Sequence, residues 1–270
     1  LESLDILEHE EKDNSADSVP FNSHFHLIEF KNVSFRYPGC NNFVLQNINL
    51  TLERGKTYFI VGFNGSGKTT LIKLLLRLYL PTDGVILIDG EDIQNIDISQ
   101  YYSKIGAIFQ DFIQYPFDIS KNIIVNADRD NSELLSYALK EVGMDEFVQN
   151  LPSKEYTLLM RDWSGGIDLS QGQWQKLAIA RCVYKQGIIS ILDEPFSSID
   201  AESESSIITR LRESSKNNLT IFITHRFSSI SLSDQIVVLK GGKIAEQGTH
   251  DELLQHRNIY YRLYSSQKLS

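Results

Sequence analysis

The sequence predicts an α/β fold with a mostly parallel sheet, an antiparallel β edge and an inserted helical region. A glycine-rich loop joins a short apolar strand, residues 57–61, to a helix over residues 71–80, in which Leu71, Leu74, Leu75 and Leu78 lie on one face. Two later apolar strands, residues 188–192 and 219–224, are separated by an amphipathic helix. Buried strands that alternate with helices are typical of parallel sheets.

The composition is that of a globular chain. Its 270 residues are enough for one large domain or two small lobes. The formal net charge of −9 disfavours broad capture of nucleic acid, so no nucleic-acid partner is expected. Cys40 and Cys182 lie far apart without a nearby Cys or His cluster, which predicts neither a disulfide framework nor a zinc site. No apolar run reaches the roughly 18 residues that a membrane span needs.

The glycine-rich loop has the pattern of a phosphate-binding loop. It reads Gly62-Phe63-Asn64-Gly65-Ser66-Gly67-Lys68-Thr69 and is followed by Thr70. The glycines allow backbone amides to close around a pyrophosphate. We expect Lys68 to reach the β- and γ-phosphates of a nucleotide and the Thr69 hydroxyl to ligand Mg²⁺. A turn that merely caps the next helix would leave Lys68 unexplained.

Polar side chains stand at the ends of three later strands. A strand over residues 105–110 ends in Gln110, which can reach Mg²⁺ or the attacking water. The next strand delivers Asp193, placed to hold the Mg²⁺ shell, and Glu194, placed to accept a proton from the water. His225 follows the third strand and can hydrogen-bond a γ-phosphate. The plainer alternatives are a surface amide, an acidic turn and a structural histidine.

An inserted helical lobe is predicted over residues from about 111 to 175, where strand patterns are scarce. The lobe closes with Leu169-Ser170-Gln171-Gly172-Gln173, just before a helix over residues 174–185. Ser170 and Gly172 at a helix start would present N–H donors to an anion. On its own, the same pattern is an ordinary N-cap.

Strand patterns also occur on both sides of these motifs. Residues 27–38 predict a strand pair that enters a turn, and residues 44–52 predict a further strand. Tyr37 could stack on an adenine ring, although an aromatic residue in a strand more often belongs to a core. Towards the end of the chain, residues 236–246 predict a hairpin and residues 251–264 a single helix.

The first 26 residues are expected to be a connector. The sequence begins with Leu1 rather than Met, which indicates a fragment or a processed product. Apolar residues at positions 1, 4 and 7 fit the end of a helix, and the polar stretch from Glu10 to Ser18 is typical of a linker. A disordered tail and a helix continuing from a preceding domain both fit this pattern.

In their order and spacing, these motifs resemble the nucleotide-binding domain of ATP-binding cassette (ABC) transporters, over nearly all of residues 27–268. The resemblance implies a P-loop NTPase core of the RecA-like type. It implies that ATP is bound by Tyr37, Asn64, Gly65, Ser66, Gly67, Lys68, Thr69, Thr70, Ser170, Gly172 and Asp200. It further implies a Mg²⁺ shell at Thr69, Gln110 and Asp193, and catalysis by Glu194, His225, Lys68 and Gln110.

The family names for these segments are Walker A for 62–69, Q-loop for Gln110, signature for 169–173, Walker B for 190–194, D-loop for 197–200 and switch histidine for His225.

Two positions depart from the family pattern. Gln171 stands where the signature usually has Gly, and Ser190 interrupts the usually apolar Walker B run. The functional groups at Ser170, Asp193 and Glu194 are unchanged, so activity should survive.

Two segments, Tyr115–Ile123 and Glu246–Leu254, resemble the exporter subclass, in which this domain follows a six-helix membrane domain. On that resemblance, residues 1–26 connect to a transmembrane domain, and residues 27–270 form the ATP-binding domain on the cytoplasmic face of the cell membrane. The residues around the signature, Trp163, Gly165, Gly166 and Trp174-Gln175-Lys176, resemble bacterial peptide and lantibiotic exporters.

The resemblance also implies a partner and a cycle. Two such domains pair head to tail, here as a homodimer, and ATP on Walker A of one chain meets Ser170 and Gly172 of the other. Three alternatives stay open: the separate ATPase subunit of an importer, a soluble ABC ATPase of DNA repair or translation, and a nucleotide-binding role without catalysis. The zinc modules, coiled-coil insertions or basic arms typical of the soluble class are not visible.

Overall fold

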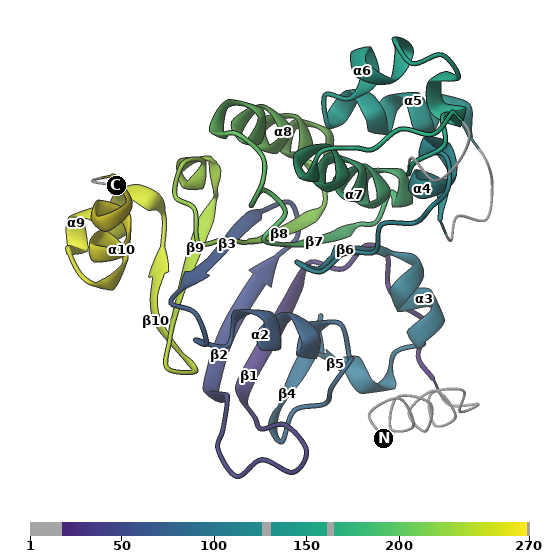
Figure 1. Cartoon of the computed structure of the whole chain (residues 1–270). Helices are drawn as coiled ribbons and strands as arrows, with labels where there is room; N and C mark the ends of the chain where they lie inside the picture. Colours follow the sequence, from purple (N-terminus) through teal and green to yellow (C-terminus); the bar gives the residue numbers. More distant parts are fainter. Residues whose placement is uncertain (1–17, 126–130, 161–164, 269–270) are drawn as a thin grey trace. The chain divides into compact units, whose positions relative to one another are not determined.

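The computed structural model describes residues 18–125, 131–160 and 165–268 (Figure 1). The predicted helical end at positions 1, 4 and 7, most of the linker from Glu10 to Ser18, and Trp163 lie outside these residues. The chain forms two compact units. Unit 1 contains the residues up to Lys104 and those from Ser233 onward, and unit 2 contains Ile105–Leu232.

Unit 1 holds a four-stranded antiparallel sheet in the order β2-β1-β4-β5. The strands are β1 (Leu27–Phe35), β2 (Leu45–Glu53), β4 (Asp83–Ile88) and β5 (Glu91–Asp92). The expected strand pair over residues 27–38 is wrong, because β1 is a single strand with register shifts on both sides of Val33. Asn32, just before Val33, has a φ of +52°, so the strand bulges without turning back.

Three further strands of unit 1 surround the glycine-rich loop. Strand β3 (Thr57–Gly62) pairs in parallel with β9 (Gln235–Lys240), and β10 (Lys243–Gly248) completes the predicted hairpin with β9. Every residue of β3 is buried. Parallel strands that are covered on both faces have this continuous apolar pattern rather than alternation. The mixed arrangement confirms the predicted α/β fold with an antiparallel edge.

The helix after the loop is shorter than the sequence predicts. Helix α2 spans Lys68–Leu75 and buries Leu71, Leu74 and Leu75. The chain leaves the helix at Arg77, whose φ is +53°, and Leu78 is 40% exposed. The Arg77 guanidinium donates a hydrogen bond to the Ile96 carbonyl at 2.6 Å. This long-range contact favours the break, so the expectation that Leu78 shares the buried face is wrong.

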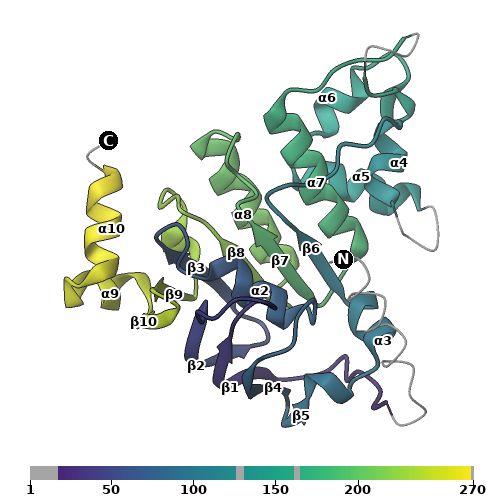
Figure 2. The same ribbon diagram turned by 60° about the horizontal axis from the view of Figure 1, so that its bottom comes forward.

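The remaining helices of unit 1 include α3 (Ile98–Ser103) and two at the C-terminus. The predicted single helix over residues 251–264 is wrong, since α9 (His250–His256) and α10 (Ile259–Lys268) are separate. Arg257 ends α9 with a φ of +52°. Both helices contact β10 and each other (Figure 2).

Residues 18–26 of the predicted connector pack onto unit 1. Val19 forms a parallel bridge with Ile96. Phe21 lies edge-on to the Tyr101 ring, with centroids 5.3 Å apart. Phe21 and Phe25 are buried, so this stretch contributes to the core of the unit.

Unit 2 contains three parallel strands in the order β6-β7-β8. They are β6 (Ile105–Ile108), β7 (Ile189–Asp193) and β8 (Leu219–Ile223). Its helices are α4 (Ile119–Ile124), α5 (Ser132–Glu141), α6 (Asp145–Gln149), α7 (Gln171–Lys185) and α8 (Ala201–Ser214). Short 3₁₀ turns lie at Ile93–Asn95 in unit 1 and at Lys154–Tyr156 and Ile230–Leu232 in unit 2. The strand expected to end in Gln110 ends two residues earlier, at Ile108.

Helix α7 is the centre of the helical part of unit 2, where it contacts α4, α5 and β6 (Figure 1). It begins at Gln171 with a capping box between Ser170 and Gln173. The plain N-cap interpretation of Ser170 is therefore correct as far as local structure goes.

None of the helices in the described ranges is long and apolar enough to cross a membrane.

Candidate functional site

The phosphate-binding loop of unit 1 is fixed by steric constraints on two glycines. Gly62 ends β3 with a φ of +151°, and Gly67 precedes α2 with a φ of +101°. A Cβ on Gly62 would lie 2.2 Å from the Leu239 carbonyl oxygen, and one on Gly67 would lie 2.6 Å from the Leu45 side chain. The Leu239 oxygen belongs to the backbone and excludes a side chain at Gly62, whereas at Gly67 the Leu45 side chain could shift and it is the positive φ that favours glycine.

The Lys68 ammonium is held over the loop that precedes it. The residue is 7% exposed, and its Nζ donates to the carbonyls of Gly62 at 3.0 Å and Phe63 at 3.3 Å. A buried ammonium needs such acceptors, because an unpaired buried charge is very costly. The carbonyls thereby hold the cation beside the amides of the loop.

The loop fits an oxygen-rich anion. The Ser66 hydroxyl is buried and forms no hydrogen bond within the described residues. Buried polar atoms without a partner are uncommon in folded proteins and call for an explanation. A phosphate oxygen would supply the missing acceptor, and the start of α2 adds favourable N–H groups. Asn64, Gly65 and Thr69 are exposed around this buried group.

Tyr37 is tied to the helix that follows the loop. Its hydroxyl lies 3.1 Å from the Thr70 Oγ1, and its ring meets Tyr79 edge-on at 5.1 Å. The Lys73 ammonium lies 5.7 Å from the centre of the Tyr37 ring. The structure therefore brings Tyr37 together with Thr70 and the loop within unit 1. Stacking of Tyr37 on adenine remains a prediction.

In unit 2, the two carboxylates lie where β7 ends. Asp193 is the last residue of the strand and is buried. Glu194 follows with a φ of +50°, and its N–H donates to the Ile223 carbonyl at 2.9 Å. Because this backbone conformation is unusual for a residue with a Cβ, the hydrogen bond to β8 must hold it in place.

Glu194 and His225 form a pair at the ends of neighbouring strands. The Glu194 Oε1 lies 3.3 Å from the His225 Nδ1. The turn that carries His225 is fixed by Thr224, whose Oγ1 accepts from the Arg226 N–H at 2.9 Å. The Glu194 side chain is 15% exposed and that of His225 is 50% exposed, so the pair is open to solvent on the histidine side.

The signature residues lie at the first turn of α7. The Ser170 hydroxyl accepts from the Gln173 N–H at 3.2 Å, and the Gln173 side chain accepts from the Ser170 N–H at 2.8 Å. A Cβ on Gly172 would lie 2.7 Å from the Ser198 carbonyl oxygen. Gln171, which departs from the family pattern, accepts a hydrogen bond from the Gln114 side chain at 3.3 Å.

Two other predicted residues lie elsewhere in unit 2. Asp200 is the N-cap of α8, and its carboxylate accepts from the Ser203 N–H at 2.8 Å. This hydrogen bond lowers the pKa of Asp200 below its ordinary value. Gln110 is exposed two residues beyond β6. The structure thus groups Glu194 with His225, and Gly172 with the segment that precedes Asp200.

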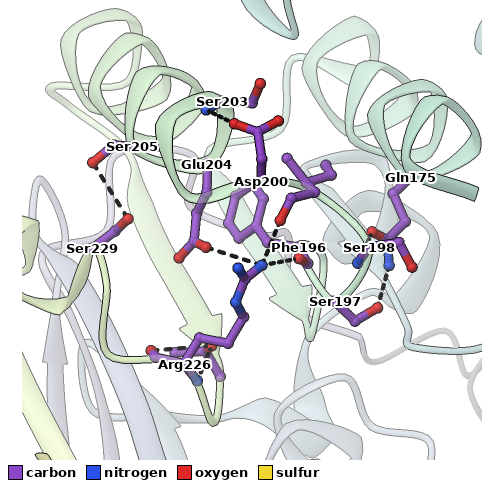
Figure 3. Close-up of polar contacts among 12 residues, drawn as sticks. Gln175, Phe196, Ser197, Ser198, Asp200, Ser203, Glu204, Ser205, Arg226 and Ser229 are labelled. Carbon is purple, nitrogen blue, oxygen red and sulfur yellow. Dashed lines mark hydrogen bonds and ion pairs between the residues drawn. The ribbon is translucent and has the colours of Figure 1, made fainter. Parts of the chain in front are cut away.

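The sequence prediction missed three side chains beside this segment, Gln175, Glu204 and Arg226 (Figure 3). Gln175 Oε1 accepts from the Ser198 N–H at 2.7 Å. Glu204 is 1% exposed and lies 3.2 Å from Arg226. One signal was available: Glu204 lies three and four residues before the buried Ile207 and Ile208, which places an acid on the apolar face of α8.

Ser190, which interrupts the usually apolar Walker B run, has a structural explanation. Burial raises the pKa of the Cys182 thiol to about 11, and a hydrogen bond with Ser190 acts in the opposite direction. A Cβ on Gly106 would lie 2.6 Å from the Cys182 sulfur, so the strand and helix pack closely here. Ser190, on strand β7, therefore gives the buried Cys182 thiol of helix α7 a polar partner.

Magnesium would not be held by a dense acidic cluster. Among the residues that the structure describes, no group of three or more His, Cys, Asp and Glu side chains could hold a metal ion. Mg²⁺ usually takes only one or two carboxylates and keeps several waters. The expected ligands Thr69, Gln110 and Asp193, with one carboxylate among them, fit an ion that is bound mainly through nucleotide phosphates.

Comparison with known proteins places the chain in a family. The family profile described as ABC transporter matches residues 45–197. Human ATP-binding cassette sub-family B member 5 is 40% identical over 243 residues, which are 90% of this chain and 19% of that protein. The subtilin transport ATP-binding protein SpaT of Bacillus subtilis is 35% identical over 265 residues, which are 97% of this chain and 43% of that protein.

A solved structure shows the same fold. The structure of a bacterial Atm1-family ABC exporter with ATP bound has a TM-score of 0.87 and 32% identity, and the match covers 94% of this chain and 44% of the other. The chain therefore spans less than half the length of each of these three relatives. The profile match covers more than half of the 270 residues, and it confirms the resemblance that the motifs carry: the chain belongs to the ABC transporter family.

Proposed function

We propose that the chain is the ATP-binding and ATP-hydrolysing domain that powers export through a transmembrane domain, fused or associated. The observation that carries hydrolysis is the Glu194–His225 pair, 3.3 Å apart at the ends of adjacent parallel strands. Glu194 is the group that accepts a proton from the attacking water. His225 hydrogen-bonds the γ-phosphate and responds to its loss.

Unit 1 supplies the groups that bind the phosphates. Lys68 contributes a fixed positive charge, and the glycine backbone of the loop contributes N–H donors. The buried Ser66 hydroxyl supports this assignment, because it has no hydrogen-bond partner among the described residues. The other residues assigned to the nucleotide in this unit are Tyr37, Asn64, Gly65, Gly67, Thr69 and Thr70.

The residues assigned to Mg²⁺ are Thr69, Gln110 and Asp193. Their hydroxyl, amide and carboxylate oxygens are ligands that this ion prefers. When bound, the ion neutralises negative charge that develops on the transferred phosphoryl group. Gln110 is exposed after β6, so its side chain is free of packing that would oppose this role.

The wider assignment follows the family and the names of the relatives. Residues 27–270 form the ATP-binding domain with a helical subdomain over about 111–175, and residues 1–26 form the connector. A second copy pairs head to tail, so that Ser170, Gly172 and Asp200 act on the nucleotide of the partner. The domain works on the cytoplasmic face of a membrane. A peptide cargo is supported by SpaT, whose name assigns it to subtilin transport.

Replacing Glu194 with glutamine tests the reaction. Glu194→Gln keeps the shape of the side chain and removes the base, so kcat for ATP hydrolysis should fall by about 10²- to 10⁴-fold. ATP binding should persist, and ATP with magnesium should favour a dimer. Glu202→Gln, at an exposed position on α8, is the matched control and should hydrolyse ATP at the unsubstituted rate. Unchanged turnover in Glu194→Gln would remove this residue from the base role.

The exporter assignment has a separate test. A membrane domain of six helices encoded directly upstream of Leu1 would match the fused arrangement of the subclass. Vesicles that contain the complete protein should then accumulate a labelled peptide in an ATP-dependent manner. An upstream sequence that encodes a zinc module or a second ATP-binding domain would instead favour the soluble class.

A further inference from the structure

The short segment that follows the two carboxylates is held by side chains from other elements. This segment, Phe196–Asp200, begins two residues after Glu194 and ends at the N-cap of α8. Phe196 and Ile199 are buried, whereas Ser197 and Ser198 are exposed. One backbone turn hydrogen bond lies within it, from the Ile199 N–H to the Phe196 carbonyl at 3.1 Å. The path of the segment depends on this bond and on the side chains that bind it.

Arg226 binds the segment at both ends (Figure 3). Its Nη1 donates to the Phe196 carbonyl and, at 2.7 Å, to the Ile199 carbonyl. A planar guanidinium can serve several acceptors in a fixed geometry, which a lysine ammonium on its flexible stem does not reproduce. Arg226 thus reinforces the turn hydrogen bond that joins Phe196 to Ile199.

Glu204 holds the guanidinium in place. Its Oε2 lies 3.2 Å from the Arg226 Nη1, and the residue is almost fully buried on α8. Burial raises the pKa of Glu204, and the positive charge of Arg226 opposes that rise. A buried carboxylate is costly unless it is paired, and Arg226 supplies the opposite charge, with the Ser228 and Ser229 side chains as further hydrogen-bond partners of Glu204.

Gln175 holds the middle of the same segment from α7. It accepts from the Ser198 N–H at 2.7 Å and donates to the Ser197 hydroxyl. Gly172, one turn earlier on α7, approaches the Ser198 carbonyl so closely that it could carry no Cβ. The helix that begins with the signature and the turn after β8 therefore bind one segment.

Arg226 is also the residue after His225, and its own N–H is bound by Thr224. A change in the guanidinium contacts acts directly on the turn that carries the histidine. We propose that Arg226, whose guanidinium contacts the Phe196 and Ile199 carbonyls and Glu204, is a positioning residue that fixes the Phe196–Asp200 segment and with it the Glu194–His225 geometry. This inference rests on the proposed ATP hydrolysis and adds a determinant of its rate.

The test compares two arginines of unit 2 that each donate to backbone carbonyls. Arg226→Lys keeps the charge beside Glu204 but loses the rigid planar group whose Nη1 donates to both carbonyls of the segment. Arg210→Lys is the matched control, because the Arg210 Nη1 donates to the Lys140 carbonyl at 2.6 Å, away from the segment. In steady-state assays with Mg-ATP, Arg226→Lys should lower kcat about 10- to 100-fold, as small misplacements of reacting groups do.

A fall in kcat without a change in KM distinguishes a positioning role from a general loss of folded protein. KM for ATP should stay within about twofold in Arg226→Lys, because the phosphate-binding loop with Lys68 lies in unit 1 and is unchanged. Amide hydrogen exchange in peptides spanning Phe196–Asp200 should quicken in this variant and not in Arg210→Lys. A kcat equal to that of the unsubstituted chain overturns the proposal, and so does a kcat loss that merely equals the loss of folded protein.

A second variant covers the case in which Arg226→Lys does not fold. Glu204→Gln keeps the side-chain shape and removes the opposite charge that aims the guanidinium, so it should lower kcat several-fold at unchanged KM. Unchanged kcat there would also overturn the proposal. If the unsubstituted chain itself does not hydrolyse ATP, the proposed function fails instead, so the two failures are distinguishable.

Discussion

The phosphate-binding loop in unit 1 and the Phe196–Asp200 segment in unit 2 are shaped by different forces. The loop follows its path because Cβ atoms at Gly62 and Gly67 would overlap neighbouring atoms. The segment follows its path because Arg226 and Gln175 donate and accept hydrogen bonds along it. The atoms that exclude a side chain from the loop belong to Leu239 and Leu45, so both regions depend on residues distant in the sequence, and they differ in the kind of force.

This difference affects how each region should respond to substitution. A steric constraint fails abruptly, because an added methyl group of fixed size cannot be accommodated. A set of hydrogen bonds fails gradually, because each lost bond costs only about 0.5–3 kcal/mol and the others remain. The loop should therefore show all-or-none effects, and the segment should show graded ones.

The largest effect is expected for the loop cation. Lys68→Ala removes the charge that we assign to the phosphates, so kcat/KM for ATP should fall by about 10²- to 10³-fold, as for other lost electrostatic stabilisers. Lys56→Ala is the control, since Lys56 is half-buried and pairs with Glu53 at 2.8 Å, outside the loop. Steady-state ATPase assays would measure both. Intact turnover in Lys68→Ala would show that the loop does not act on the phosphates.

A smaller but sharp effect is expected for the loop glycine. Gly62→Ala places a Cβ 2.2 Å from the Leu239 carbonyl, so the free energy of unfolding should fall by about 3 kcal/mol or more. Gly39→Ala also introduces a Cβ at positive φ, but nothing lies within 4 Å of it. Chemical denaturation should show the difference between the two variants. Equal losses would mean that backbone strain, rather than overlap, dominates at Gly62.

The smallest effect is expected for substitutions at the two helix caps. Ser170 caps α7 in unit 2 and Thr249 caps α9 in unit 1, each in a capping box. Replacing either with alanine should lower the free energy of unfolding by about 1 kcal/mol. Only Ser170→Ala should also reduce ATP turnover, because only Ser170 is assigned to the nucleotide. If both variants lose stability and neither loses turnover, Ser170 is a cap and nothing more.

The sequence predicted those parts of the fold that depend on local patterns. The order of β3, the loop and α2 follows from neighbouring residues, and so do the ends of β7 and β8. The family assignment also rested on such motifs and was confirmed by the profile match. Local steric rules and apolar periodicity were sufficient at these positions.

The errors occurred where a distant contact decides the structure. Helix α2 stops before Leu78 because the chain turns at Arg77, which binds the Ile96 carbonyl. The C-terminal helix divides at Arg257, and Glu246 accepts from the Ile259 N–H at 2.5 Å to start α10. The Ile96 carbonyl and the Glu246 carboxylate both lie outside the stretch of residues over which a periodic pattern is read.

The same limit explains the side chains missed near the site. Arg226 binds carbonyls about thirty residues earlier in the chain, and a backbone carbonyl carries no sequence signal. Glu204 could have been suspected from its place on the apolar face of α8, but its partner could not be named from spacing alone. Buried ion pairs become visible only when the fold brings their elements together.

The packing around Cys182 has a practical consequence for spectroscopy. The chain has two cysteines, and only Cys40 is exposed, while the buried Cys182 keeps its proton well above neutral pH. A thiol-reactive fluorophore would therefore attach to Cys40 without any engineered substitution. Conformational changes of unit 1 during nucleotide turnover could then be followed in the native sequence.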